Sequence, residues 1–227
     1  MKIFNKPVGE TPLGLIKRKK LEGAAYAGRL DPMAEGLMIV LDKDIEKKNR
    51  KVFENLDKVY RFDVLYGIET DTYDILGIPK IRKTKEKHEI TSGEFIQPYP
   101  PYSYFRVNGK PLFYWARKGE IAKIKIPEKK VTIKKIEKLK KFSMNNNELL
   151  DYVKTRIIKV SGNFRQEKIL NEWEKLLSKE QSFDCETYIA LVSSGTYIRS
   201  IANQSGGVAI KIIREKVGEF SLEDVID

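Results

Sequence analysis

The chain has 227 residues, of which 41% are hydrophobic and 33% are charged, a composition typical of a globular protein with a heavily charged surface. No window approaches 18 consecutive apolar residues and the N-terminus lacks an apolar signal core, so we expect a cytoplasmic protein without membrane spans. Cys185 and His88 are the only residues of their kinds, which excludes disulfide frameworks, cysteine-based zinc sites, Ser-His-Asp triads and paired-histidine metal sites.

The charge balance is strongly basic. Lysine and arginine number 43 against 32 aspartate and glutamate residues, which gives a formal net charge of +11. Such a surface attracts polyanions, and nucleic acid is the first partner to consider. A lysine-rich solvated surface explains the same balance equally well, so motifs must decide between the two.

Residues 1–45 contain three short apolar runs separated by turn-rich segments. The runs at 1–4 and 37–41 predict strands, and the run at 13–16 predicts a short helix. A long loop is expected between that helix and the second strand, over the segment that contains 27–32.

The middle of the chain mixes strand and loop signals. Residues 59–68 alternate polar and apolar side chains, which predicts a half-buried strand, and the turn formers and carboxylates of 69–77 predict a loop. The prolines of 97–102 exclude regular helix and a central strand. Residues 106–112 then predict a turn before a helix at 113–119.

The last hundred residues carry clearer periodicity. Residues 121–141 alternate lysine with aliphatic side chains and predict strand, whereas 164–177 place apolar residues at helical spacing. The polar segments 145–147 and 178–182 are expected to be linkers. The remaining predicted elements are a strand over 186–192, the start of a helix over 195–202 and a closing turn at 218–220.

Two residues stand in positions suited to chemistry. Asp31 lies in a loop bounded by glycines and followed by Pro32, so its carboxylate is presented from constrained backbone, as a nucleophile or base requires. Arg199 follows a predicted strand-to-helix junction, and an arginine beside an aspartate keeps the carboxylate ionised and oriented. By local chemistry alone, a turn aspartate and a surface arginine explain the two residues as well.

Five blocks, in the same order and at compatible spacing over most of the chain, resemble those of TruB-type tRNA pseudouridine synthases. The blocks are Lys6-Pro-Val-Gly9, Gly28-Arg-Leu-Asp-Pro-Met-Ala-Glu-Gly-Leu37, Lys58-Val-Tyr-Arg61 with Thr70-Asp-Thr-Tyr-Asp74, Pro100-Pro-Tyr-Ser103 with Ala116-Arg-Lys-Gly119, and Ser193-Ser-Gly-Thr-Tyr-Ile-Arg199. One such block would be weak evidence, but five in order are specific.

The resemblance implies an α+β fold with a mixed, largely antiparallel sheet flanked by helices and an active site in a central cleft. It implies that Asp31 is the catalytic aspartate, Arg199 its ion-pair partner and Tyr60 the aromatic that stacks on the target base. Asp74 matches a base-contacting aspartate. The implied reaction converts a T-loop uridine of tRNA to pseudouridine without metal or other cofactor, by a protein that we expect to be a monomer.

The remaining expected RNA contacts are basic or aromatic. Lys6 and Arg29 lie in the matched blocks, and Tyr26 stands where the family usually has a histidine, so that an aromatic side chain would wedge against bases there. Further lysine and arginine residues suited to hold phosphates by sequence-independent attraction are Lys17, Arg18, Lys19 and Lys20 together with Lys134 and Lys135 of the basic run 123–141.

Domain organisation is expected to be simple. The resemblance implies one catalytic domain over residues 1–227, with a helical insertion around 143–182 that short members of the family do not need. Because the sequence ends soon after Phe220, we expect no separate C-terminal RNA-binding domain of the kind that many relatives carry.

Three other functions stay open at this point. One is a non-catalytic RNA-binding or RNA-folding protein on the same scaffold, and another is a synthase that modifies a different RNA with the help of partner proteins. The third is a hydrolase in which Asp31, Asp71 and Asp74 surround Mg²⁺, since carboxylate clusters bind hard cations.

Overall fold

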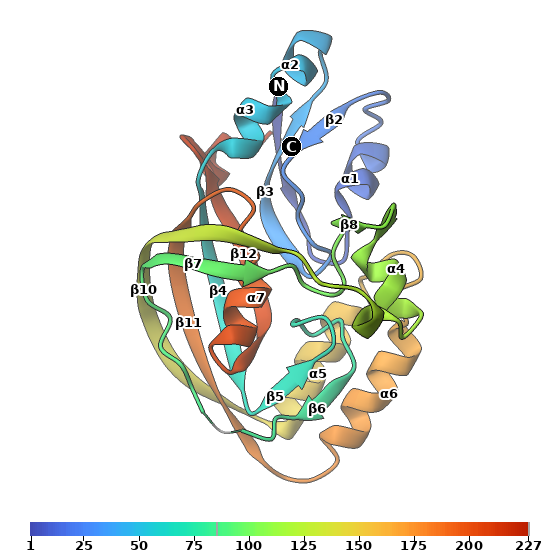
Figure 1. The fold of residues 1–227 in the computed structure, drawn as a ribbon, viewed down its shortest axis with the longest axis vertical. Coiled ribbons are helices and arrows are strands. Elements are labelled where there is room, and N and C mark those ends of the chain that lie inside the picture. The colour runs from blue at the N-terminus through green and yellow to red at the C-terminus, as the bar shows by residue number, and fades with distance from the viewer. Residues whose placement is uncertain (85, 227) are drawn as a thin grey trace.

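A computed structural model describes residues 1–84 and 86–226 (Figure 1). Within that range, nine strands join in one sheet. The strands of this sheet are β1 (Lys2–Lys6), β2 (Ala25–Ala27), β3 (Ala34–Leu41), β4 (Lys58–Tyr66), β7 (Gly93–Pro98), β10 (Glu128–Asn145), β11 (Ser182–Val192), β12 (Gly207–Val217) and β13 (Phe220–Ser221). Two short hairpins, β5 (Ile68–Thr70) with β6 (Pro79–Ile81) and β8 (Arg106–Val107) with β9 (Lys110–Pro111), lie outside it.

The sheet runs in the order β1-β3-β12-β4-β11-β10-β7, with β2 beside β3 and β13 beside β12. Its pairings are antiparallel except for the parallel pair of β12 and β3, where Ile212 lies opposite Ala34. The expected α+β fold with a mixed, largely antiparallel sheet is therefore confirmed. The proline-rich segment that begins at Gln97 forms only the end of β7, at the sheet edge, where missing backbone donors are tolerated.

Helices cover both faces of the sheet (Figure 1). They are α1 (Pro12–Arg18), α2 (Asp44–Lys48), α3 (Arg50–Asn55), α4 (Leu112–Arg117), α5 (Asn146–Ile157), α6 (Gln166–Leu176) and α7 (Ile198–Gln204), with 3-10 turns at Ile121–Lys123 and Leu222–Asp224. No helix in the described part of the chain is long and apolar enough to cross a membrane.

The described residues form three hydrophobic cores, and strand alternation places the side chains of β4 in two of them. Along β4, Phe62 and Val64 point toward the core that α7 closes with Ile198, Ile201 and Ala202. Neighbouring positions such as Leu65 point to the opposite face, where α5 and α6 contribute the buried residues Leu149, Val153, Ile157, Ile169 and Trp173. The period-two pattern read from 59–68 thus seats one helical layer on each face.

Several element predictions were wrong in detail. The predicted loop 69–77 begins inside β5, because Thr70 pairs with Pro79 of β6. The predicted linker at 145–147 is the end of β10 followed directly by α5. Asn145 caps that helix by accepting from the backbone nitrogen of Glu148 at 3.0 Å, while the Glu148 side chain accepts from the backbone nitrogen of Asn145 at 2.9 Å. The 143–182 segment contains α5 and α6, which pack against each other.

Candidate active site

Asp31 lies in the loop that precedes β3, and contacts on both sides hold this loop in place. The Gly9 backbone nitrogen donates to the Pro32 carbonyl oxygen at 2.7 Å, and Arg214 donates from Nη1 to the Arg29 carbonyl oxygen at 3.2 Å. The Asp31 side chain keeps 27% of its surface exposed. The sequence-based expectation of a carboxylate presented from constrained backbone therefore describes its position.

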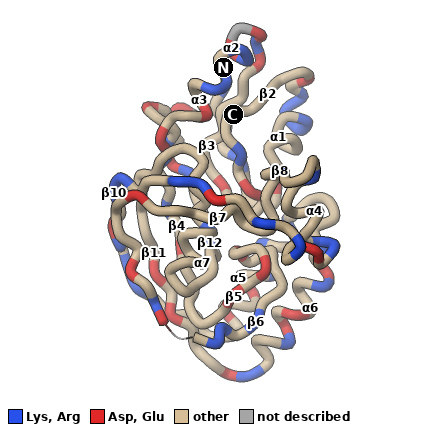
Figure 2. Tube along the Cα trace, viewed as in Figure 1, with Lys and Arg blue, Asp and Glu red and all other residues tan. Residues whose placement is uncertain are grey.

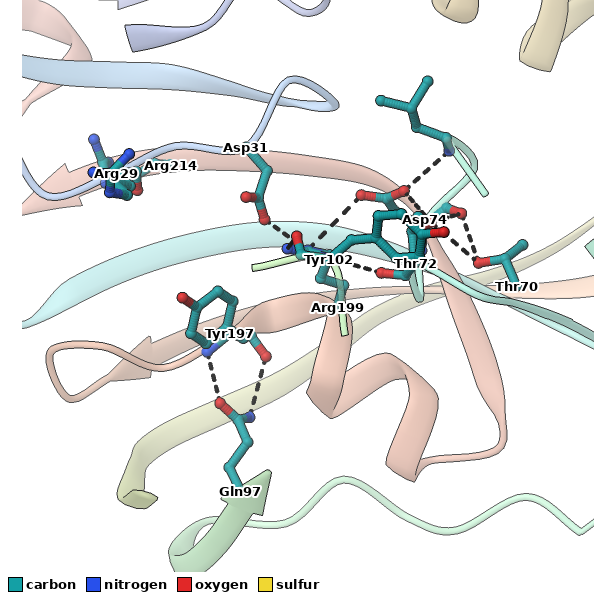
Figure 3. A network of polar contacts seen from close by, with 11 residues as sticks. Arg29, Asp31, Thr70, Thr72, Asp74, Gln97, Tyr102, Tyr197, Arg199 and Arg214 are labelled. Carbon is teal, nitrogen blue, oxygen red and sulfur yellow. Dashed lines mark hydrogen bonds and ion pairs between the residues drawn. The ribbon is translucent and has the colours of Figure 1, made fainter. Parts of the chain in front are cut away.

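Arg199, the second residue of α7, reaches Asp31 across the site (Figure 3). Its Nε donates to Asp31 Oδ2 at 2.6 Å, while Nη1 donates to the Thr72 carbonyl oxygen at 2.6 Å and Nη2 donates to the Tyr102 carbonyl oxygen at 3.2 Å. Its side chain is only 3% exposed. Charge-assisted bonds in three directions fix the plane of the guanidinium group and, through it, the Asp31 carboxylate.

Asp74 lies behind this pair. Its Oδ2 is 3.8 Å from Arg199 Nε, and its Oδ1 accepts from the Thr72 hydroxyl at 2.7 Å and from the Leu76 backbone nitrogen at 3.0 Å. Burial raises the pKa of Asp74 to about 6 even though Arg199 acts in the opposite direction. Asp74 is therefore a buried carboxyl that shares Arg199 with Asp31.

Other ionisable groups near the aspartates are strongly affected by burial. Burial, reinforced by Asp31, raises the pKa of Tyr197 to about 12, so this phenol is neutral at physiological pH. Burial lowers the pKa of Lys6 to about 7 against the opposing effect of Asp31. Burial acts to lower the pKa of Arg199, but the carboxylates of Asp31 and Asp74 outweigh it and the pKa is raised, which keeps the guanidinium charged.

Two adjoining hollows open at Asp31. The first has a volume of about 370 Å³, and Tyr60, which is 7% exposed, forms part of its wall. The second has a volume of about 500 Å³ and is lined by Tyr26, Phe113 and Phe164. The two hollows share the lining residues Arg29, Leu30, Asp31, Tyr104 and Arg199.

The structure thus brings Asp31, Arg199, Tyr60 and Asp74 together, with Tyr26 and Arg29 at the edge of the second hollow. Arg29 lies over the Tyr104 ring, 4.1 Å from its centroid. Lys6 is different from the exposed lysines: it is fully buried, and its Nζ donates to the carbonyl oxygens of the adjacent turn at 2.9 and 2.7 Å.

The remaining predicted RNA contacts lie on the surface, where basic and acidic positions are interspersed (Figure 2). In α1, Arg18 donates to both carboxylate oxygens of Glu10 at 2.9 Å, and in β10 the Lys134 ammonium lies 2.6 Å from a carboxylate oxygen of Asp57. Lys17, Lys20 and Lys135 are exposed, and Lys19 Nζ lies 5.2 Å from the centre of the Phe4 ring.

Several residues that build the site could not be identified from the sequence. The side-chain amide of Gln97 in β7 makes two hydrogen bonds with the Tyr197 backbone. It donates to the Tyr197 carbonyl oxygen at 3.1 Å and accepts from the Tyr197 backbone nitrogen at 2.8 Å. Arg214 of β12 is 1% exposed and lines the first hollow, where its Nε also donates to the Leu37 carbonyl oxygen at 2.8 Å. The segment 207–217 also contains Lys211, Glu215 and Lys216, so the sequence does not distinguish Arg214 as the buried charged residue of this strand.

The magnesium hypothesis does not agree with these contacts. Asp31 and Asp74 both face Arg199, and Asp71 accepts from Arg165 Nη1 at 2.7 Å, so each carboxylate is paired with an arginine. Within residues 1–84 and 86–226, no cluster of three histidine, cysteine or acidic side chains has the arrangement to hold a metal ion.

Comparisons with known proteins agree with the five blocks. A family model described as "TruB family pseudouridylate synthase (N terminal domain)" matches residues 17–164. A protein named tRNA pseudouridine synthase B from Aquifex aeolicus (strain VF5) is 30% identical to this chain; the match covers 99% of this chain and 70% of that protein. A protein of the same name from Endomicrobium trichonymphae is 31% identical, and the match covers 99% of this chain and 87% of that protein. One chain of a solved structure of a Cbf5-Nop10-Gar1 complex is 16% identical, with a TM-score of 0.48. The superposition covers 96% of this chain and 49% of that chain. The chain belongs to the TruB family of pseudouridylate synthases.

Proposed function

We propose that this protein is a tRNA pseudouridine synthase that isomerises a T-loop uridine in the first hollow, with Asp31 as its catalytic residue. The observation that carries the proposal is the Asp31 carboxylate, part exposed at a hollow and held at 2.6 Å by an arginine that is itself buried. Relatives of about 30% identity along nearly the whole chain bear the name of this activity.

The chemistry needs few groups. Isomerisation breaks the bond between uracil N1 and the sugar, turns the ring and rejoins the sugar to C5, and the proton lost from C5 is balanced by one gained at N1. One anionic oxygen suffices to attack or to remove a proton, and Arg199 keeps that oxygen aimed. We assign no other group a covalent role.

The target base must leave its stack to reach Asp31, at a cost of a few kcal/mol that the hollow must recover through contacts. A volume of about 370 Å³ lies within the range of small-ligand sites. In this proposal Tyr60 stacks on the base and Asp74 contributes to base recognition through the loop that it anchors. The neutral Tyr197 phenol adds an uncharged polar group to a lining that also includes the charged side chains of Arg199 and Arg214.

The same proposal extends to the rest of the complex with tRNA. Tyr26 and Arg29 contact bases next to the target, and Lys17 and Lys20 supply most of the contacts to phosphates along the T-arm, with a smaller contribution from the lysines of β10. Residues 1–227 act as one catalytic domain with an insertion around 143–182, and the protein works in the cytoplasm as a monomer.

The deciding experiment compares wild type with Asp31→Asn on unmodified tRNA, and maps pseudouridine by chemical labelling and sequencing. We expect one modified T-loop position with the wild type and at least a 10³-fold slower conversion with the variant, because the amide keeps the shape of the carboxylate and lacks its charge. Binding of tRNA should stay within threefold, which serves as the folding control. Conversion by the variant within tenfold of the wild type, or modification confined to other RNAs, would contradict the proposal.

A further inference from the structure

The connector between α5 and α6, residues 158–165, lies against several separate parts of the site. The Ser161 backbone nitrogen donates to the carbonyl oxygen of Gly9 at 3.2 Å, in the turn that supports the Asp31 loop. Arg117 of α4 donates from Nη2 to the Asn163 carbonyl oxygen at 2.9 Å. The insertion is therefore bonded to the catalytic scaffold at the side where the second hollow opens.

The connector ends in a strained and well-anchored turn. Arg165 has a φ of 65°, a left-handed conformation that costs an ordinary residue about 1 kcal/mol or more. The Gln166 side chain holds this geometry by donating to the carbonyl oxygens of Val160 at 3.0 Å and Gly162 at 2.6 Å, and by accepting from the Phe164 backbone nitrogen at 2.8 Å. A glycine would meet the backbone requirement without strain, so the side chain of Arg165 is what this position gains.

The Arg165 side chain makes a bidentate contact with Asp71, in the loop that follows β5. Arg165 Nη1 donates to Asp71 Oδ2 at 2.7 Å and Nη2 donates to Asp71 Oδ1 at 3.3 Å, while Oδ1 also accepts from the Ile78 backbone nitrogen at 2.8 Å. The same guanidinium lies over the Tyr102 ring, 4.4 Å from its centroid. One arginine therefore restrains both Asp71 and Tyr102.

These two restrained residues lead directly to Arg199. Asp71 precedes Thr72, whose carbonyl oxygen accepts from Arg199 Nη1, and the Tyr102 carbonyl oxygen accepts from Arg199 Nη2. The two carbonyl oxygens that orient the Arg199 guanidinium thus belong to chain segments that Arg165 contacts.

We propose that Arg165 is a positioning residue, which fixes the Thr72 and Tyr102 carbonyl oxygens and thereby the orientation of the Arg199–Asp31 pair. This inference rests on the proposed function for its catalytic consequence, whereas its structural part concerns Arg199 alone. It assigns the 143–182 insertion a task in the reaction itself.

The test replaces Arg165 by Gln and by Lys. In single-turnover assays at saturating enzyme, we expect Arg165→Gln to slow conversion by about 10–100-fold, since small misplacements of catalytic groups have effects of this size. The dissociation constant for tRNA should change less than threefold. Arg165→Lys should recover part of the rate, because it restores the charge at Asp71 but not the bidentate contact.

Three further variants guard against a general loss of folding. Asp71→Asn should slow conversion as Arg165→Gln does. The Asp71→Asn/Arg165→Gln double variant should be no slower than the slower single variant, because both substitutions remove the same interaction between Arg165 and Asp71. Lys154→Gln breaks the exposed pair of Lys154 with Glu174 at 2.8 Å, which joins α5 to α6 away from the site, and should react at the wild-type rate.

A measurement on Arg199 itself separates the two proposals. The Nε–H proton of Arg199 is bonded to Asp31 and buried, so its nuclear magnetic resonance signal, assigned by its loss in Arg199→Lys, should exchange slowly with water. We expect exchange to accelerate at least tenfold in Arg165→Gln and not in Lys154→Gln. Unchanged exchange, or weaker tRNA binding at an unchanged single-turnover rate, would overturn the positioning role. A wild type that produces no pseudouridine while Nε–H exchange responds to Arg165 would refute the proposed function alone.

Discussion

Arg199 shows how much one side chain must do at this site. It is buried, carries a permanent charge and donates to a carboxylate and two backbone carbonyl oxygens that leave in three directions. The planar arrangement of five donors meets this demand, whereas a lysine ammonium cannot reach all three acceptors from one point.

We therefore expect Arg199→Lys to slow single-turnover conversion by at least 100-fold at saturating enzyme. The lysine retains a charge near Asp31 but leaves at least one buried carbonyl oxygen without a donor, at a cost of about 1–3 kcal/mol, and the carboxylate loses its orientation. Thermal unfolding provides the accompanying check, because a stability loss of the same order should appear. A rate within threefold of the wild type would remove Arg199 from the catalytic arrangement.

Asp74 predicts a pH dependence of stability with a definite sign. Its pKa is raised from an ordinary 3.8 to about 6, so the folded state binds this proton more tightly than the unfolded state. The contribution is complete below about pH 4 and is lost as the pH rises through 6, at ~1.4 kcal/mol per pH unit. The free energy of unfolding of wild type relative to Asp74→Asn should fall by about 2 kcal/mol between pH 4 and pH 6, and by about 3 kcal/mol between pH 3 and pH 7. A difference that stays flat or rises would contradict the burial of an ionisable Asp74.

At the scale of elements, the basic side chains of the surface fall into two groups: those that already pair with a carboxylate and those that are free to contact RNA phosphates. Lys134 in β10 lies 2.6 Å from Asp57, whereas Lys17 and Lys20 at the end of α1 are exposed, and the start of this helix lines the second hollow. Charges already paired with carboxylates release fewer counterions when RNA binds.

The salt dependence of tRNA binding should reflect this division. Replacing both Lys17 and Lys20 by Gln should flatten the slope of log affinity against log salt by about 1.5, since each phosphate contact contributes about 0.7–0.9. Lys134→Gln serves as the control and should change the slope by less than half as much as one α1 lysine. Single-turnover rates at saturating enzyme should stay unchanged in all these variants. A slope altered only by changes in β10 would place the RNA along that strand instead.

Elements with a clear local signal could be predicted from the sequence, and those defined by tertiary pairing could not. The alternation at 59–68 fixed β4 and the apolar spacing at 164–177 fixed α6 because each pattern faces one core. The central strand β12 went unrecognised although glycines flank it, because four of its eleven residues are charged and its identity depends on lying between β3 and β4. Its Arg214 was missed with it, whereas Asp31 and Arg199 were found because each stands in a recognisable motif.

At the scale of the whole molecule, Cys185 provides a single reporter of folding. It is 1% exposed in β11, between β10 and β4, and burial raises the pKa of its thiol to about 12. A thiol reagent should therefore label the native protein on the order of 10³-fold more slowly than the chain in denaturant, because access requires opening of the sheet. Labelling at comparable rates would contradict the buried position.

The place of β12 in the sheet has a consequence for how the protein is made. Ribosomes synthesise β3 and β4 well before residues 207–217, yet β12 must lie between them and supplies Ile212 and Arg214 to the first hollow. The growing chain therefore holds incomplete sheet edges until residues 207–217 have been translated, and these pairings are slow to form because they join distant residues. We expect Cys185 on ribosome-stalled chains that lack β12 to remain open to thiol reagents. A nascent chain therefore acquires the complete lining of the first hollow only after β12 has emerged from the ribosome.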